Sequence, residues 1–233
     1  MKGSLAQVIA IVAHGNWWLA NPSGKPPDLL HTNSTFQYVE DVIFADGRDM
    51  NLMEWFEHCK SDTPTLRLWG ETVTELRDRS LVAWSPTWTW SGHSSWGVVY
   101  RATRKSGGDA FSKWDVAEAS GQLRAALLAI RAFSQREAIN WVDWFERALE
   151  ALDASEPHAR FHDDALPARG YSIEARRLYA AAVNSYVFGG MGTWNDMVLP
   201  VEVDDQHQRL GRDLYAAMMF AFHASVNSWP QDR

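Results

Sequence analysis

The pattern of apolar and polar positions changes once along this chain, near residue 108. Before that point, apolar and β-branched residues recur with a period of two between turn residues, which predicts strands. One helix is expected at about 50–60, where four apolar side chains fall on one face: Leu52, Trp55, Phe56 and Cys59. The predicted strands cover residues 5–13, 35–45, 65–74, 81–90 and 96–103.

After Ser106-Gly107-Gly108, apolar residues recur every three to four positions, as in amphipathic helices. Asp115 and Ser134 are each followed three residues later by a glutamate, the spacing of helix N-caps, so two helices are predicted to begin there. A polar connection over 153–170 separates them from two further helices. The third is expected from its cap Ser172 to the glycines at 189–190, and the fourth over about 205–227.

These elements predict an α+β fold with strands first and helices after. The N-terminal part, residues 1–108, is expected to be a mainly antiparallel sheet with one helix. The C-terminal part, residues 109–233, is expected to be a bundle of about four helices packed on that sheet. We expect the two parts to form a single compact unit.

Composition narrows the class of protein. With 46% hydrophobic and 22% charged residues, the chain of 233 residues can bury a sizeable core. The net charge of −7 has the wrong sign for a nucleic-acid binder. No apolar run reaches the roughly 18–20 residues of a membrane span, and the only cysteine, Cys59, excludes an internal disulfide. We therefore predict a cytoplasmic protein with neither nucleic acid nor membrane as its partner.

Tryptophan is unusually frequent, with 13 residues. Trp84, Trp88 and Trp90 have even numbers, so a continuous strand places them on one face, although Pro86 could break the register; Trp96 follows after a turn. Two interpretations stay open. The row fills the core under the helices, or it forms an exposed face on which sugar rings stack or to which a protein partner binds.

Motifs for chemistry or metal binding are weak. His158 and His162 are four residues apart and precede Asp163, but they lie between two prolines and lack the glutamate of a metallopeptidase motif. The glycines at 189–192 resemble a phosphate loop, yet they close a predicted helix instead of opening one, which favours a cap and turn. We therefore assign no catalytic residue, no metal and no cofactor.

The string Phe188-Gly189-Gly190-Met191-Gly192-Thr193-Trp194-Asn195-Asp196, with its flanking alanine-rich helices and the preceding tryptophan-rich strands, resembles bacterial immunity proteins of polymorphic toxin and type VI secretion systems. These are α+β proteins that bind and neutralise a cognate toxin. The resemblance implies a toxin as partner, with nuclease effectors as one such type. It implies no catalytic residue, because such proteins are inhibitors.

The charge distribution agrees with this interpretation. Residues 1–108 hold 10 basic and 11 acidic residues, whereas residues 109–233 hold 12 and 18, so the acidity lies in the helical part. An acidic inhibitor is steered quickly to the basic surface of an enzyme that cuts nucleic acid. We expect the partner to contact an aromatic and acidic surface made by Trp88, Trp90, Trp194, Asp196, Asp204 and Asp205.

Two alternatives belong to other classes of function. A hydrolase or small-ligand-binding protein would use a tryptophan-lined cleft with His14, with His93 or with the pair His158 and His162, and is favoured by a deep pocket with several perturbed histidines and carboxylates. A scaffold or oligomer interface is favoured by a large symmetric apolar patch.

Overall fold

The computed structural model describes residues 3–62, 64–77, 80–90, 95–106, 114–189 and 192–229. The chain divides into two compact units. The sheet unit comprises Gly3–Ser112 with Asp164–Gly170 and the C-terminal residues from Trp229, and the helical unit comprises Lys113–Asp163 and Tyr171–Ser228. This division lies close to the predicted change at residue 108. Packing of the two parts as a single compact unit remains a prediction.

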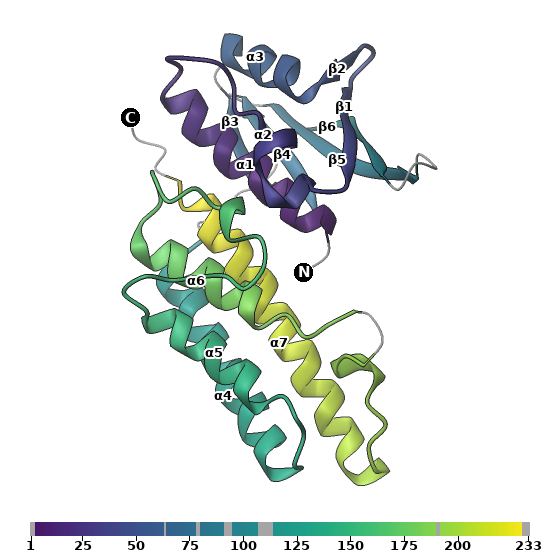
Figure 1. The fold of residues 1–233 in the computed structure, drawn as a ribbon, viewed down its shortest axis with the longest axis vertical. Coiled ribbons are helices and arrows are strands. Elements are labelled where there is room, and N and C mark those ends of the chain that lie inside the picture. The colour runs from purple at the N-terminus through teal and green to yellow at the C-terminus, as the bar shows by residue number, and fades with distance from the viewer. Residues whose placement is uncertain are drawn as a thin grey trace. The chain divides into compact units, whose positions relative to one another are not determined.

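The sheet unit contains six strands in the order β2-β1-β6-β5-β4-β3 (Figure 1). All neighbouring strands are antiparallel except β1 and β6, which run parallel. The sheet is therefore mainly antiparallel, as predicted. The strands are β1 (Val39–Ala45), β2 (Asp49–Asn51), β3 (Thr65–Trp69), β4 (Thr72–Arg77), β5 (Ser80–Trp90) and β6 (Trp96–Ser106).

The predicted strand at 5–13 is wrong, because these residues lie in helix α1 (Gly3–Ala20). Every side chain from Leu5 to Ala13 is buried, so the helix shows no polar face and its sequence lacks a helical period. Gln7 is also buried, where its Nε2 donates to the Thr35 carbonyl at 3.1 Å. An apolar run of this length does not distinguish a buried helix from a buried strand.

Other predictions for the sheet unit need smaller corrections. The expected strand at 35–45 begins as a 3-10 turn, η1 (Ser34–Phe36), and that at 65–74 is two strands joined by a turn at Gly70, which has a φ of +60°. The predicted helix is confirmed as α3 (Leu52–Asp62), with all four predicted apolar residues buried. Two more helices belong to this unit although the sequence predicts neither of them: α1 and α2 (Leu29–Thr32).

An aromatic core holds the sheet unit together. Phe44 stacks between Trp55 and Tyr100, at centroid distances of 4.1 and 4.7 Å. The fully buried Glu75 satisfies two indoles, because its Oε1 accepts hydrogen bonds from Nε1 of Trp55 at 3.1 Å and from Nε1 of Trp84 at 2.5 Å. A buried carboxylate is thus part of the core of the sheet unit, which also buries polar side chains such as Gln7, Asn16 and Arg67.

The helical unit contains four long helices: α4 (Val116–Arg136), α5 (Val142–Asp153), α6 (Ile173–Asn184) and α7 (Val201–Asn227). The predicted caps Asp115 and Ser172 are confirmed, since their side chains accept hydrogen bonds from first-turn backbone N–H groups. The predicted helix start at Ser134 is wrong. Ser134 is buried inside α4, which continues to Arg136, so the cap spacing there is coincidental.

The ends of the last two helices also differ from the prediction. Helix α6 ends at Asn184, before the predicted glycines, and α7 begins at Val201 rather than near 205. Over the part of the chain that the structure describes, no helix combines the length and apolar character needed to traverse a bilayer.

Candidate functional site

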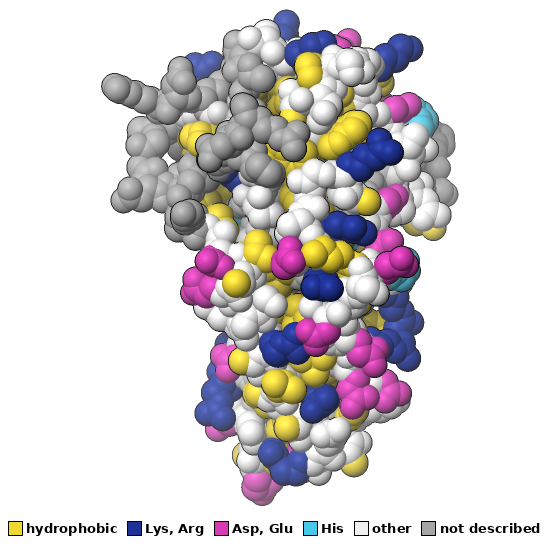
Figure 2. All heavy atoms as spheres, turned by 90° about the vertical axis from the view of Figure 1, so that its left-hand side faces the viewer, with side chains coloured by type: hydrophobic (Ala, Val, Ile, Leu, Met, Phe, Trp, Pro, Cys, Tyr) yellow, Lys and Arg dark blue, Asp and Glu magenta, His cyan; other side chains and the backbone are white. Residues whose placement is uncertain are grey.

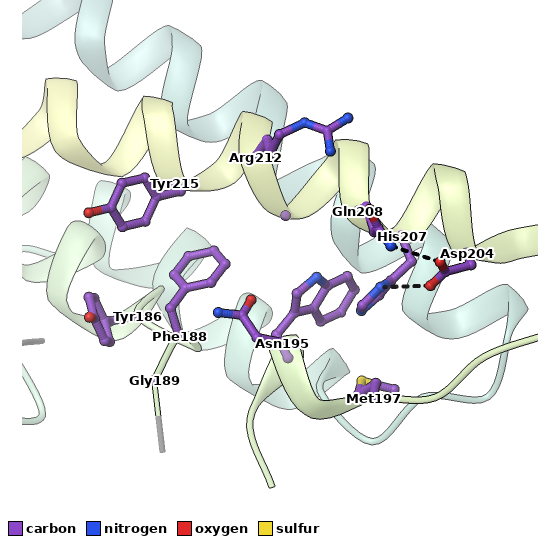
Figure 3. Close-up of a pocket in the computed structure, with 12 residues that line it drawn as sticks. Tyr186, Phe188, Gly189, Asn195, Met197, Asp204, His207, Gln208, Arg212 and Tyr215 are labelled. Carbon is purple, nitrogen blue, oxygen red and sulfur yellow. Dashed lines mark hydrogen bonds and ion pairs between the residues drawn. The ribbon is translucent and has the colours of Figure 1, made fainter. Parts of the chain in front are cut away.

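A pocket of about 700 Å³ opens in the helical unit, between the first half of α7 and the loop that follows α6 (Figure 3). Four of its lining side chains are aromatic: Tyr186, Phe188, Trp194 and Tyr215. Polar side chains line the rest, among them Asn195, Asp204, His207 and Gln208. Aromatic walls combined with a few polar groups are typical of binding sites.

The loop that carries Trp194 is built by local capping. Trp194, Asn195 and Asp196 form a 3-10 turn, η3, in which Thr193 and Asp196 cap each other reciprocally. The backbone N–H of Trp194 donates to the Val187 carbonyl at 3.0 Å, which returns the loop to the end of the preceding segment. Gly189 and Gly192 have φ values of +86° and +78°, which side-chain-bearing residues rarely adopt. The predicted turn is thus confirmed here, while Gly190 and Met191 lie outside the described residues.

Trp194 forms the floor of the pocket. Its indole is 1% exposed and stacks on the His207 ring at 4.4 Å with an interplanar angle of 26°. The ring of Phe145 meets the indole edge-on at 5.8 Å. A Cβ atom on Gly211 would lie 2.8 Å from Trp194 Nε1, so only glycine lets α7 approach the indole this closely. The floor is consequently fixed by contacts on several sides.

His207 brings an unusual polar group into this floor. It is 4% exposed, and burial lowers its pKa from the ordinary 6.5, opposed by the Asp204 carboxylate and the Trp194 backbone. The Nδ1 atom lies 3.9 Å from Asp204 Oδ1 (Figure 3). Among the described residues, no hydrogen-bond partner of normal geometry exists for either ring nitrogen of His207 or for Nε1 of Trp194. Such buried groups destabilise a protein until something bonds them.

One acidic and one basic side chain line the pocket, Asp204 and Arg212, and exposed acidic and apolar side chains lie near them in the sequence. Asp204 accepts a hydrogen bond from Gln208 Nε2 at 2.7 Å, and the neighbouring Asp205 is exposed. Tyr215 is 38% exposed. The segment leading into α7 exposes two valines almost completely, Val198 at 97% and Val201 at 86%. Exposed apolar side chains beside carboxylates mark a surface suited to a partner.

The structure brings together only some of the predicted contact residues. Trp194 and Asp204 line the same pocket, but Trp194 belongs to the core of the helical unit rather than to an exposed surface. Asp196 is exposed and caps the η3 turn. Trp88 and Trp90 lie in the sheet unit. The predicted contact residues therefore belong to two different units, and their contact with a partner remains a prediction.

Sequence reasoning missed the residues that α7 adds to the pocket. His207, Gly211 and Tyr215 follow one another at four-residue steps, so they share one face of the helix. That face is not uniformly apolar. A search for apolar residues at helical spacing therefore finds the apolar stripe of α7 and not this face. A search for polar and aromatic residues at helical spacing next to the 188–196 turn could have found it.

The tryptophan row is confirmed in its geometry. Trp84, Trp88 and Trp90 pair with Ala102, Val98 and Trp96 on β6, so the three share one face of the sheet. Trp84 is buried at 2% exposure, whereas Trp90 is 53% exposed. The row is therefore buried at one end and exposed at the other, and binding by its exposed end remains a prediction.

Two histidines of the enzyme alternative, His14 and His158, each have a partner within their own unit. His14 contacts the Asp164 carbonyl through Nε2 at 2.8 Å in the sheet unit, and His158 pairs with Asp163 at 2.9 Å in the helical unit. His93 lies outside the described residues. In the described ranges, no group of three or more His, Cys, Asp or Glu side chains could hold a metal ion.

Comparisons with known proteins yielded no match to any family model, curated protein or solved structure. The site therefore has to be interpreted from its own geometry.

Proposed function

We propose that this protein binds a basic protein partner through the pocket of its helical unit, and that the partner is a bacterial toxin which it neutralises in the cytoplasm. The observation that carries the binding role is the pocket itself, with its closely packed aromatic floor and the exposed Tyr215 at its edge. The identity of the partner as a toxin rests on the resemblance of residues 188–196 to immunity proteins.

The pocket has the features of a protein-binding hot spot. Its aromatic side chains are held by their neighbours, as Phe188 and Tyr215 meet edge-to-face at 5.4 Å. Little conformational entropy is then lost when a partner's side chain enters between them. Tyrosine and tryptophan dominate measured binding energies at such positions.

Charge supports a basic partner. The face of the helical unit seen in Figure 2 carries acidic and basic side chains next to one another. Helices α4 and α5 are joined by ion pairs such as Arg124 with Asp153 at 2.6 Å. Near the pocket, residues 196–205 instead hold four carboxylates, Asp196, Glu202, Asp204 and Asp205, and no lysine or arginine, while Arg212 lines the pocket itself. Carboxylates arranged in this way speed association with a cationic surface.

The test is co-purification of the tagged protein from its native cell, followed by an assay of the retained partner's activity. We expect one stoichiometric protein whose activity is lost on binding, with association slowed by salt. Tyr215→Ala should weaken that complex about tenfold or more. Asp205→Lys should slow association most strongly at low salt.

Phe161→Ala is the matched control, because Phe161 is an aromatic residue of the same unit, 49% exposed and absent from the pocket lining. It should leave the complex unchanged. A retained partner that binds all three variants equally well would place the contact elsewhere and refute the proposal.

Nε1 of Trp194, which is buried and has no hydrogen-bond partner among the described residues, favours a second candidate function, the binding of a small molecule that bonds it. A fragment screen by NMR, observing the indole N–H of Trp194, tests it. Fragments that shift this signal, together with no retained protein, would favour this candidate over partner binding.

A further inference from the structure

The β5–β6 hairpin carries three tryptophan side chains near the end at which β5 stops and β6 starts, Trp88, Trp90 and Trp96, which we call the aromatic corner. Trp96 meets Trp88 at 6.2 Å and 76°, and it meets Trp90 at 5.0 Å and 68°. The Trp96 backbone N–H donates to the Tyr38 carbonyl at 2.8 Å, which ties the start of β6 to the residue before β1. Trp96 is therefore set at a steep angle to both Trp88 and Trp90.

The corner is exposed although its rings are large. Trp90 is 53% exposed and Trp96 38%. Exposed aromatic residues gathered at one place on a folded unit are typical of a binding site. Trp90 and Trp96 meet at 68°, so they do not form one coplanar platform. The face of an exposed indole attracts a cation placed within about 6 Å of the ring centroid.

A carboxylate lies beside these rings. Glu40 accepts a hydrogen bond from Ser95 Oγ at 2.6 Å, which holds it next to the start of β6. The register of β1 is irregular between Val39 and Asp41, so Glu40 occupies the irregularity opposite Trp96. Negative charge beside electron-rich ring faces favours a positively charged ligand over an anion or a neutral molecule.

The adjacent strand edge is open among the described residues. The last pairing of β5 with β4 joins Trp84 to Val73, whereas its pairing with β6 continues to Trp90. Residues 85–90 thus have a strand on one side only. Pro86, which lacks an N–H, lies in this stretch, as prolines within strands do at edges. Such an edge can accept another extended chain.

We propose that the aromatic corner binds a lysine or arginine side chain carried by an extended segment of a partner polypeptide, and that this segment pairs with the edge of β5 at residues 85–90. The rings and Glu40 recognise the cation, and the strand edge recognises the backbone. This site lies wholly in the sheet unit and does not depend on the function proposed for the pocket.

The probe is a short peptide that alternates threonine and valine around one central lysine. It is titrated into the full-length protein while the indole N–H signals are followed by NMR. We expect the signals of Trp90 and Trp96 to shift. Replacing the lysine by norleucine, which removes the charge and keeps the chain length, should weaken binding about two- to fivefold. Methylating alternate backbone nitrogens of the peptide should abolish it.

Matched variants distinguish binding at this site from nonspecific binding. Trp90→Leu should abolish the shifts, whereas Trp69→Leu should preserve them, because Trp69 is a 42% exposed tryptophan on β3. Glu40→Gln should weaken binding of the lysine peptide but not of the norleucine peptide. Asp41→Asn should change neither, since Asp41 pairs with Gly97 and its side chain leaves the sheet on the face opposite Trp96.

Equal affinities of the lysine and norleucine peptides would overturn recognition of the cation. Equal affinities of the peptide and its methylated form would overturn pairing with the strand edge. Absence of any shift in the unmodified protein, whose fold the spectrum itself reports, would overturn the site.

Discussion

Two glycines in the helical unit should respond in opposite ways to the same substitution. In an exposed helix, Gly→Ala stabilises by about 0.8–1.0 kcal/mol through backbone propensity. Gly121 of α4 is exposed, and an added Cβ would meet nothing within 4 Å. Gly121→Ala should therefore gain about that amount.

Gly211→Ala has the same gain in helix propensity, but its added Cβ would collide with the floor of the pocket. Its Cβ would lie 2.8 Å from Trp194 Nε1 and 3.2 Å from the adjacent Cδ1. The indole cannot retreat freely, because His207 stacks on it and Phe145 meets it edge-on. Overfilling a well-packed core costs about 1–3 kcal/mol. The net effect is a loss of up to about 2 kcal/mol, so the two variants should differ by about 1–3 kcal/mol.

Urea unfolding of the two variants and the parent protein, followed by circular dichroism, measures this difference. The indole N–H signal of Trp194 gives a local readout, which should move in Gly211→Ala and stay in place in Gly121→Ala. If Gly211→Ala stabilises as much as Gly121→Ala, then Trp194 is not held against α7, and the rigid floor on which the proposed function depends does not exist.

Three further outcomes are expected from the same unfolding measurements. The free energy of unfolding should fall as pH decreases below 6.5. Burial lowers the folded-state pKa of three histidines, His14, His207 and His223. The unfolded chain therefore takes up protons at a higher pH than the folded chain. A stability that rises in that window would contradict their burial. Glu75→Leu should cost about 1–3 kcal/mol for each indole N–H left without its acceptor, and Glu75→Gln, which keeps an oxygen, should cost less. Asp115→Ala should cost about 1 kcal/mol and unravel the first turn of α4, visible as faster amide exchange there.

Periodicity predicted the elements that bury one face and expose the other. Helix α3 and strands β5 and β6 were found because their burial follows the period of the sequence. The even spacing of Trp84, Trp88 and Trp90 also predicted their common face. It could not predict their exposure, because that depends on what packs against the face, and Trp84 is covered by contacts with Phe44 and Trp55.

The failures have a common physical cause. Helix α1 is buried on all sides, and Ser134 lies inside α4 at a spacing that also suits a cap. In both cases tertiary contacts override a local signal. The pocket is a further example, because it requires Trp194 to meet His207 across a loop whose path is set by a hydrogen bond to Val187.

The string at 188–196 acquires a specific physical role from this geometry. Its glycines and its capping turn return the chain so that Trp194 is buried under α7. A substitution of Trp194 would therefore remove the floor and destabilise the helical unit, whatever its effect on a partner. Loss of binding in such a variant would not identify a contact. The binding role has to be tested at the rim, where Tyr215 and Asp205 can be changed while the floor remains in place.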